Sequence, residues 1–365
     1  MSETLRTEVK KVSLTAIRAE LRNLWTSEAL NREGVIRARS HNLVVYTDMT
    51  RHNVADLVEH IIRVNAQRPG RVILVQYDPG AADRLDAWVT VYCQPRHDHL
   101  VCSEMVVLEV GDDFRGELHS TVVALLAADL PIYLWWMQLP DPDDHLYRQL
   151  SLEADRLIVD SDFFRDMAAE LPALLALGGI RVSDLAWARL TPWRRHLAQF
   201  WDLAHLRAAL AHLHRLEVRY GARTPGGDAN RALLLTGWLA ARLEWELAGA
   251  RAIRAGGYDI AYRAGGAALE VRLLPEESPD VPQRELASVT LGAGEEPASV
   301  SPRLTYRPEH RCIEIDLCSA IEHDWAFRPV GPAEALAEEL DHDYDLAYRA
   351  ALERAVEVVQ ACRHA

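Results

Sequence analysis

Lysine is nearly absent from this chain of 365 residues. Lys10 and Lys11 are the only two, so 38 of the 40 basic residues are arginine. A phosphate-binding P-loop carries a lysine after its glycines, and Schiff-base catalysis needs a lysine amine inside the folded core. Since both lysines stand near the N-terminus, we expect neither class of enzyme.

Positive charge as a whole is also in deficit. The chain has 40 Lys and Arg against 54 Asp and Glu, which gives a net charge of −14. Proteins that bind nucleic acids or anionic membranes present clustered positive charge. We therefore expect no nucleic acid and no membrane among the partners.

Long apolar runs are missing too. The most apolar stretch, residues 122–137, is interrupted by Asp129 and Pro131, and it is shorter than the roughly 18–20 residues that span a bilayer. The first 25 residues mix charged and apolar side chains and lack the apolar centre of a secretory signal. These features predict a cytoplasmic protein.

Cysteine is scarce and irregularly spaced. The five residues include no CxxC pair, so we expect neither a disulfide framework nor a zinc ribbon; they are Cys93, Cys102, Cys312, Cys318 and Cys362.

The sequence lacks the common catalytic motifs. It contains no GxGxxG after a strand, no GxSxG and no HExxH, so we expect no catalytic residue, no metal and no cofactor. Asp160, Ser161 and Asp162 follow a predicted strand, at the edge where parallel sheets bind ligands. Two carboxylates there would repel a phosphate, and we interpret them as helix N-caps.

Buried strands alternate with helices in the first half of the chain. Residues 71–78 are nearly all apolar, as in a strand that is covered on both faces. Residues 85–94 and 100–110 alternate apolar and polar side chains around a polar turn, which predicts an antiparallel pair. The whole pattern predicts an α/β fold with a mixed, mostly parallel sheet flanked by helices.

The second half is organised differently. Residues 183–216 are predicted to be largely helical, and several β-like runs with short polar connections follow up to residue 317. Such a succession predicts an antiparallel meander, closed by a final helix. We expect an α/β domain over residues 1–190 and an α+β domain over residues 191–365.

Tryptophans stand out beside arginines. Trp135 and Trp136 lie side by side on a predicted strand, and Trp193 precedes Arg194 and Arg195. Tryptophan and arginine are enriched among the anchors of protein interfaces, so these five residues are candidates for partner binding. The alternative is that the indole rings fill the core.

Several of these segments resemble one family. ADLPIYLWW (residues 128–136), ADRLIVDS (154–161) and DLAWARLTPWR (184–194) resemble the glucose-6-phosphate dehydrogenase assembly proteins called OpcA. RVILVQYDP and VCSEMVVLEVG, earlier in the chain, fit the same pattern. The resemblance implies a protein that is not an enzyme, binds glucose-6-phosphate dehydrogenase, promotes its active oligomer and raises its activity. It thereby implies a role in NADPH supply by the oxidative pentose phosphate pathway.

The resemblance also implies a place to look for redox control. A redox link through cysteines has been suggested for photosynthetic members, and Cys312 and Cys318 would be the pair here. On one extended strand their Cα atoms would lie roughly 20 Å apart, whereas a disulfide needs about 7 Å or less. Unpaired thiols in a buried or edge strand are therefore the favoured alternative.

Two other functions remain open from the residues alone. One is an enzyme or sensor that binds a sugar phosphate at the carboxyl ends of the parallel strands, because arginine suits phosphate recognition. The other is a scaffold that binds the dehydrogenase without altering its activity.

Overall fold

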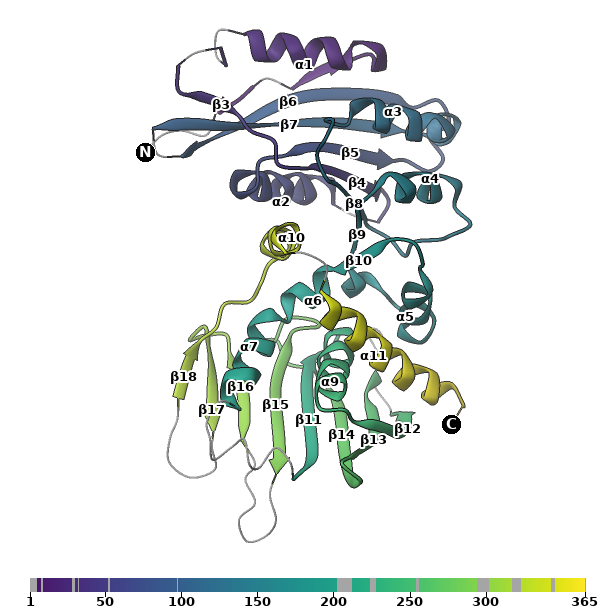
Figure 1. Cartoon of the computed structure of the whole chain (residues 1–365), viewed down its shortest axis with the longest axis vertical. Coiled ribbons are helices and arrows are strands. Elements are labelled where there is room, and N and C mark those ends of the chain that lie inside the picture. Colours follow the sequence, from purple (N-terminus) through teal and green to yellow (C-terminus); the bar gives the residue numbers. More distant parts are fainter. Residues whose placement is uncertain are drawn as a thin grey trace. The chain divides into compact units, whose positions relative to one another are not determined.

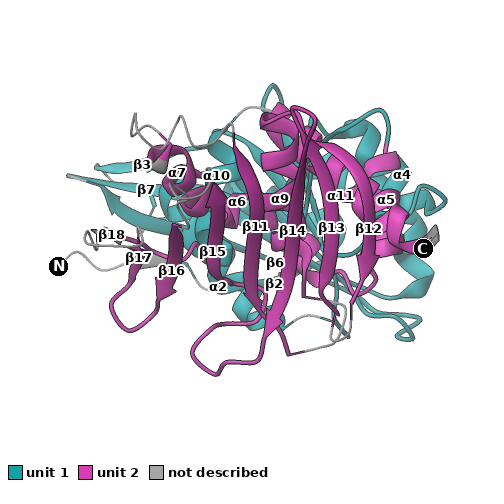
Figure 2. Ribbon diagram, turned by 90° about the horizontal axis from the view of Figure 1, so that it is seen from below, with its two compact units in different colours: residues 1–159, 178–183, 332–344 teal, residues 160–177, 184–331, 345–365 magenta. Residues whose placement is uncertain are grey.

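The computed structural model describes residues 5–7, 9–27, 30–31, 33–51, 53–96, 98–201, 212–223, 228–253, 256–293, 302–316, 323–342 and 345–364. The chain forms two compact units, coloured separately in Figure 2. Unit 1 comprises residues 1–159, 178–183 and 332–344, and unit 2 comprises residues 160–177, 184–331 and 345–365. This division differs from a single boundary near residue 190, since the chain passes between the units five times.

Unit 1 is built on a ten-stranded mixed sheet. Its order is β1-β6-β7-β5-β4-β8-β9-β10, with β2 paired to β6 and β3 paired to β7. The pairs from β7 through β5, β4 and β8 to β9 are parallel, whereas β6 and β7 form the predicted antiparallel pair. The strands are β1 Leu5–Arg6, β2 Lys10–Val12, β3 Val35–Arg37, β4 Asn42–Asp48, β5 Arg71–Tyr77, β6 Leu85–Arg96, β7 His99–Val110, β8 Ile132–Trp136, β9 Arg156–Val159 and β10 Arg181–Asp184.

Unit 1 also contains several helices. Helix α2 shows how the sequence sets their limits: the Asn53 side chain accepts a hydrogen bond from the Ala55 N–H at 3.1 Å, and the helix ends before Pro69 and Gly70. An N-cap acceptor and helix-breaking residues are the expected signals at these two ends. The helices of unit 1 are α1 Ile17–Thr26, α2 Val54–Gln67, α3 Leu118–Leu125, α4 His145–Glu153 and α10 Pro332–Asp341, with 3₁₀ turns η1 Leu14–Ala16 and η2 Asp112–Glu117.

A disulfide joins β6 to β7, which corrects one expectation. Cys93 and Cys102 lie directly opposite each other in the ladder, with Cα atoms 4.0 Å apart, and both are fully buried. The expectation of no disulfide was wrong because it rested on the spacing of cysteines along the chain, not on the register of the hairpin. Of the other cysteines, Cys312 is buried in β17 and Cys362 is half-buried in α11, whereas Cys318 lies outside the described residues.

Unit 2 contains an eight-stranded sheet of order β12-β13-β14-β11-β15-β16-β17-β18. Its neighbours are antiparallel except β11 and β14, so the predicted meander is confirmed in its main feature. Residues 213–216, expected to be helical, begin the strand β11. The strands are β11 Leu213–Gly221, β12 Glu246–Ala252, β13 Tyr258–Ala264, β14 Ala267–Glu276, β15 Leu286–Ala293, β16 Arg303–Arg307, β17 Cys312–Asp316 and β18 His323–Ala326.

Two long helices pack together beside this sheet, α9 (Asn230–Arg242) and α11 (Leu346–His364) (Figure 1). Gly237 allows their close approach, because a Cβ atom there would stand 2.2 Å from the Ala351 carbonyl oxygen. The described part of unit 2 also contains the 3₁₀ turn η3 Ser161–Phe163 and the helices α5 Met167–Ala176, α6 Leu185–Arg189 and α7 Thr191–Phe200. The turn η3 and helices α6, α7 and α9 carry the side chains of the site below.

Candidate functional site

The three candidate tryptophans are buried. Trp135 is 2% exposed, and Trp136 and Trp193 are fully buried. Trp136 stacks on Tyr46 in unit 1 with ring centroids 4.0 Å apart. These rings are therefore not on the surface of the chain. Their burial agrees with the alternative that they fill the core.

The two arginines that follow Trp193 on α7 have different surroundings. The Arg194 guanidinium lies over the Trp187 ring, 3.6 Å from its centroid, and donates to Thr191 Oγ1 at 2.7 Å. Its Nη1 atom also lies 3.6 Å from Asp345 Oδ2. Arg195 is exposed. Of the five residues expected to contact a partner, Arg195 is thus the one whose side chain the surface presents most openly.

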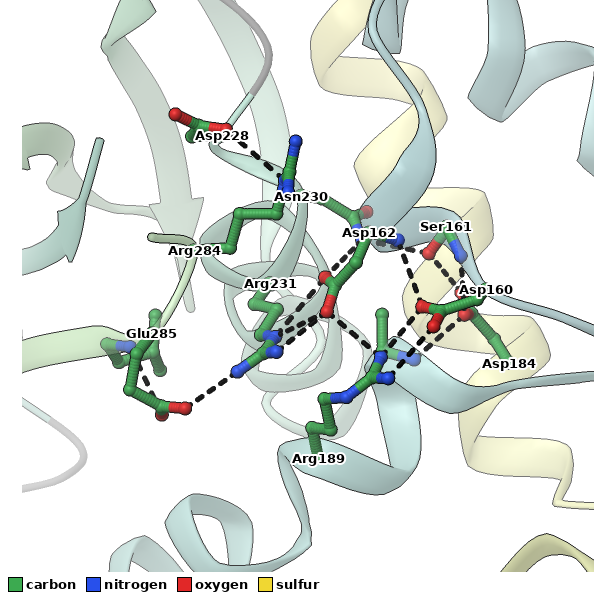
Figure 3. Close-up of polar contacts among 12 residues, drawn as sticks. Asp160, Ser161, Asp162, Asp184, Arg189, Asp228, Asn230, Arg231, Arg284 and Glu285 are labelled. Atoms are coloured by element: carbon green, nitrogen blue, oxygen red, sulfur yellow. Dashed lines mark hydrogen bonds and ion pairs between the residues drawn. The ribbon is translucent and has the colours of Figure 1, made fainter. Parts of the chain in front are cut away.

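Trp193 contacts a group of buried charged side chains in unit 2. Its indole Nε1 donates to Glu285 Oε1 at 3.2 Å, and Arg231 Nη1 donates to Glu285 Oε2 at 2.7 Å. We call this group the buried charge network (Figure 3); its members are Asp160, Asp162, Arg189, Arg231 and Glu285. None of the five is more than 7% exposed.

Each carboxylate of the network accepts from a guanidinium group. Arg189 holds Asp160 with two bonds, Nη1 to Oδ1 at 2.7 Å and Nη2 to Oδ2 at 2.8 Å. Arg231 Nη2 lies 2.7 Å from Asp162 Oδ2, and Arg189 Nη1 lies 3.0 Å from the same atom. Burial alone would raise the pKa of Asp162, but the two guanidinium groups bring it down to about 2.

Asp184 adjoins the network and caps α6. Its carboxylate accepts from the backbone N–H groups of Ser161 and Ala186, each at 3.0 Å, and from the Tyr348 hydroxyl at 3.2 Å. The Ser161 hydroxyl donates to it as well. Burial raises the pKa of Asp184 to about 7 although these hydrogen bonds oppose the shift. Asp184 is therefore the group here whose charge changes near neutral pH.

The network gathers residues that are distant in sequence. Asp160 and Asp162 follow β9, Arg189 ends α6, Arg231 stands in the first turn of α9, and Glu285 precedes β15. Sequence reasoning found the cap, since Asp160 accepts from the Asp162 N–H. It missed the ion pairs. Two acids at the end of a buried strand are a signal that cations lie nearby, but nothing in the sequence selects the partners among 38 arginines.

This arrangement is suited to fixing helices. The guanidinium groups that meet the carboxyl end of β9 are already bound by carboxylates, so they form no open phosphate pocket at that edge. In the part of the chain that the structure describes, no cluster of three or more His, Cys, Asp or Glu side chains is placed to hold a metal ion. Within the same residues, every helix is too short or too polar to cross a membrane.

Comparison with known sequences gives two consecutive matches. Residues 62–176 match the sequence model of the glucose-6-phosphate dehydrogenase subunit N-terminal domain, and residues 180–352 match that of the C-terminal domain. Together they cover most of the chain in the expected order.

Relatives carry the same family name. An OxPP cycle protein OpcA of Nostoc punctiforme is 32% identical over 185 residues, which are 49% of this chain and 39% of the relative. The Synechocystis protein of that name is 27% identical over 225 residues, 60% of this chain and 45% of the relative. The chain thus matches less than half the length of these relatives.

Among solved structures, an oxidoreductase from Sinorhizobium meliloti is similar, with a TM-score of 0.50 over 90% of this chain and 97% of that one. The sequence identity is 9%, so the likeness concerns the fold alone.

Proposed function

The chain belongs to the OpcA family of glucose-6-phosphate dehydrogenase assembly proteins, and on this basis we propose that it binds glucose-6-phosphate dehydrogenase and raises its activity. The protein acts without catalytic residues of its own, by promoting the active oligomer of the enzyme. It thereby supports NADPH production in the oxidative pentose phosphate pathway.

One observation carries this proposal: the two domain matches follow each other over residues 62–176 and 180–352. The buried charge network is compatible with it. Each of its three carboxylates is paired with one of its two arginines inside unit 2, as expected of a framework that holds helices and not of a site that receives a substrate.

The mechanism follows from differential binding. A protein shifts an enzyme toward its active state only if it binds that state more tightly than the inactive one. A preference of about 1–3 kcal/mol changes the population several-fold to about a hundredfold. The exposed side of α7 around Arg195, with Arg194 beside it, supplies one contact of this kind.

The test is a titration of purified glucose-6-phosphate dehydrogenase from the same organism with the purified chain. We expect one complex whose mass and activity rise together and level off at the same ratio. Separate migration with unchanged activity would contradict the proposal. A complex with unchanged activity would instead identify a scaffold.

The contact at α7 is tested in the same titration. We expect Arg195→Ala to weaken the complex while the melting temperature stays as in the wild type, because Arg195 is exposed. The matched control is Arg51→Ala, which removes an arginine that is also exposed. Equal affinity of the two variants would remove α7 from the interface.

A further inference from the structure

A second group of arginines in unit 1 surrounds a single buried carboxylate. Glu104 of β7 is fully buried, and the guanidinium groups of Arg37, Arg39 and Arg71 all reach it. The Trp25 indole N–H donates to the same carboxylate. We call these five residues the Arg–Trp cluster.

The two carboxylate oxygens are unequally shared. Arg71 holds Oε2 with two bonds, from Nη2 at 2.6 Å and from Nε at 2.9 Å. Oε1 accepts from Trp25 and from Arg39, the latter at 2.5 Å, and Arg37 forms an ion pair with it. Arg71 by itself therefore neutralises Glu104, and the other two guanidinium groups are additional.

The Arg–Trp cluster contains more positive than negative charge. Within the described residues, Glu104 is the only carboxylate that forms an ion pair with any of these three arginines, which leaves a local excess of two positive charges. The Arg39 Nε is buried and has no hydrogen-bond partner in that same part of the structure. Such an excess is unusual in a chain of net charge −14, in which acidic residues outnumber basic ones by 54 to 40.

Arg37 brings this charge to the surface. Its side chain is 40% exposed, against 23% for Arg39 and 12% for Arg71. The guanidinium carbon of Arg37 lies 4.7 Å from the centroid of the half-exposed Trp25 ring. Stacking on an aromatic ring holds the guanidinium in place and leaves its outer edge available for a carboxylate.

We propose that the Arg–Trp cluster is a docking point for an acidic side chain of a partner protein. Tryptophan and arginine together are the composition of interface anchors, and a partner carboxylate would complete the charge balance. The inference rests on the proposed function, because it takes glucose-6-phosphate dehydrogenase as the partner. It places a contact on unit 1, separate from α7 in unit 2.

The test measures the affinity of the dehydrogenase for the wild type, Arg37→Ala and the matched control Arg51→Ala. We expect Arg37→Ala to raise the dissociation constant about tenfold and the control to change it less than about twofold. Because the contact is ionic, the gap between wild type and Arg37→Ala should narrow as the salt concentration rises from about 50 to about 300 mM. Arg37→Lys should restore part of the affinity, since the charge remains.

The outcomes separate the two proposals. If the wild type binds and Arg37→Ala binds equally well, the docking point is wrong and the proposed function stands. If the wild type does not bind, both fall. The melting temperature of each variant shows whether the fold is kept. A second series measures the melting temperature of the chain alone, without the dehydrogenase, after inorganic phosphate is added. Stabilisation by phosphate that Arg37→Ala abolishes would mean that the cluster takes a free anion, and would overturn protein docking.

Discussion

Arg231 is held between Asp162 and Glu285, two carboxylates more than a hundred residues apart in sequence, and all three side chains are buried. Removing one partner of a buried ion pair leaves the other charge without compensation, which is the costly case for such pairs. The network therefore makes stability depend on single arginines in unit 2, whereas the many exposed ion pairs of the chain contribute little.

We expect Arg231→Met to lower the free energy of unfolding by about 3–5 kcal/mol, measured by urea denaturation. The matched control is Arg251→Met. Arg251 pairs with Asp259 at 2.8 Å but is 73% exposed, so its loss should cost at most about 1 kcal/mol. Similar losses for both variants would mean that the network is not a stabilising framework.

Asp184 makes stability depend on pH. Its pKa is about 7 in the folded chain, above the ordinary value of 3.8, so the folded state binds this proton more tightly than the unfolded state. This contribution is complete below the ordinary pKa and is lost as the pH rises through about 7. Between about pH 5 and pH 8 the wild type should lose roughly 2–3 kcal/mol relative to Asp184→Asn. Parallel urea curves for the two proteins over this range would contradict the assignment.

At the scale of elements, local sequence patterns were enough to predict individual strands and the ends of helices. The β6–β7 hairpin follows from two alternating runs around a polar turn, and the ends of α2 follow from Asn53 and from Pro69 and Gly70. The start of β11 was missed because Leu213 and Leu216 also fit a helical spacing. In the sheet, Leu216, Val218 and Tyr220 are buried while Glu217 and Arg219 between them are half-exposed, which is a strand period.

The disulfide of that hairpin could also have been predicted from the two alternating runs. Once Arg96 is paired with His99 across the hairpin, the register places Cys93 opposite Cys102. We expect the Cys93→Ala/Cys102→Ala double variant to be less stable by about 2–3 kcal/mol, the value for closing a loop of roughly ten residues. Dithiothreitol should shift the urea midpoint of the wild type toward that of the variant. A variant midpoint that also shifts would show that the reductant acts elsewhere.

At the scale of the whole molecule, the division into units depends on contacts between distant segments that no local pattern reveals. The buried Arg156 at the start of β9 donates to the carbonyl oxygens of Glu339 and His342, each at 2.6 Å, and Arg68 pairs with Asp341. These bonds bring α10, near the end of the chain, into unit 1. The same limit explains the candidate site: each arginine was visible in the sequence, but its carboxylate partner was not.

We therefore expect a fragment of residues 1–190 to lack a cooperative unfolding transition. It contains β9 without α10, and it contains the acids of the buried charge network without Arg231 and Glu285. Circular dichroism during a thermal ramp would measure this. Restoration of a sharp transition on adding a separate fragment of residues 191–365 is the expected control result, and a sharp transition of the first fragment alone would contradict the division into units.

The late return of α10 has a consequence for synthesis. A ribosome releases the chain from its N-terminus, so the sheet of unit 1 is complete by residue 184 while its helix α10 is still more than a hundred residues from being made. Unit 1 therefore cannot be completed, and Arg156 cannot reach its carbonyl partners, until residues 332–344 have emerged. A nascent chain stalled before residue 332 should therefore remain sensitive to protease in its first half.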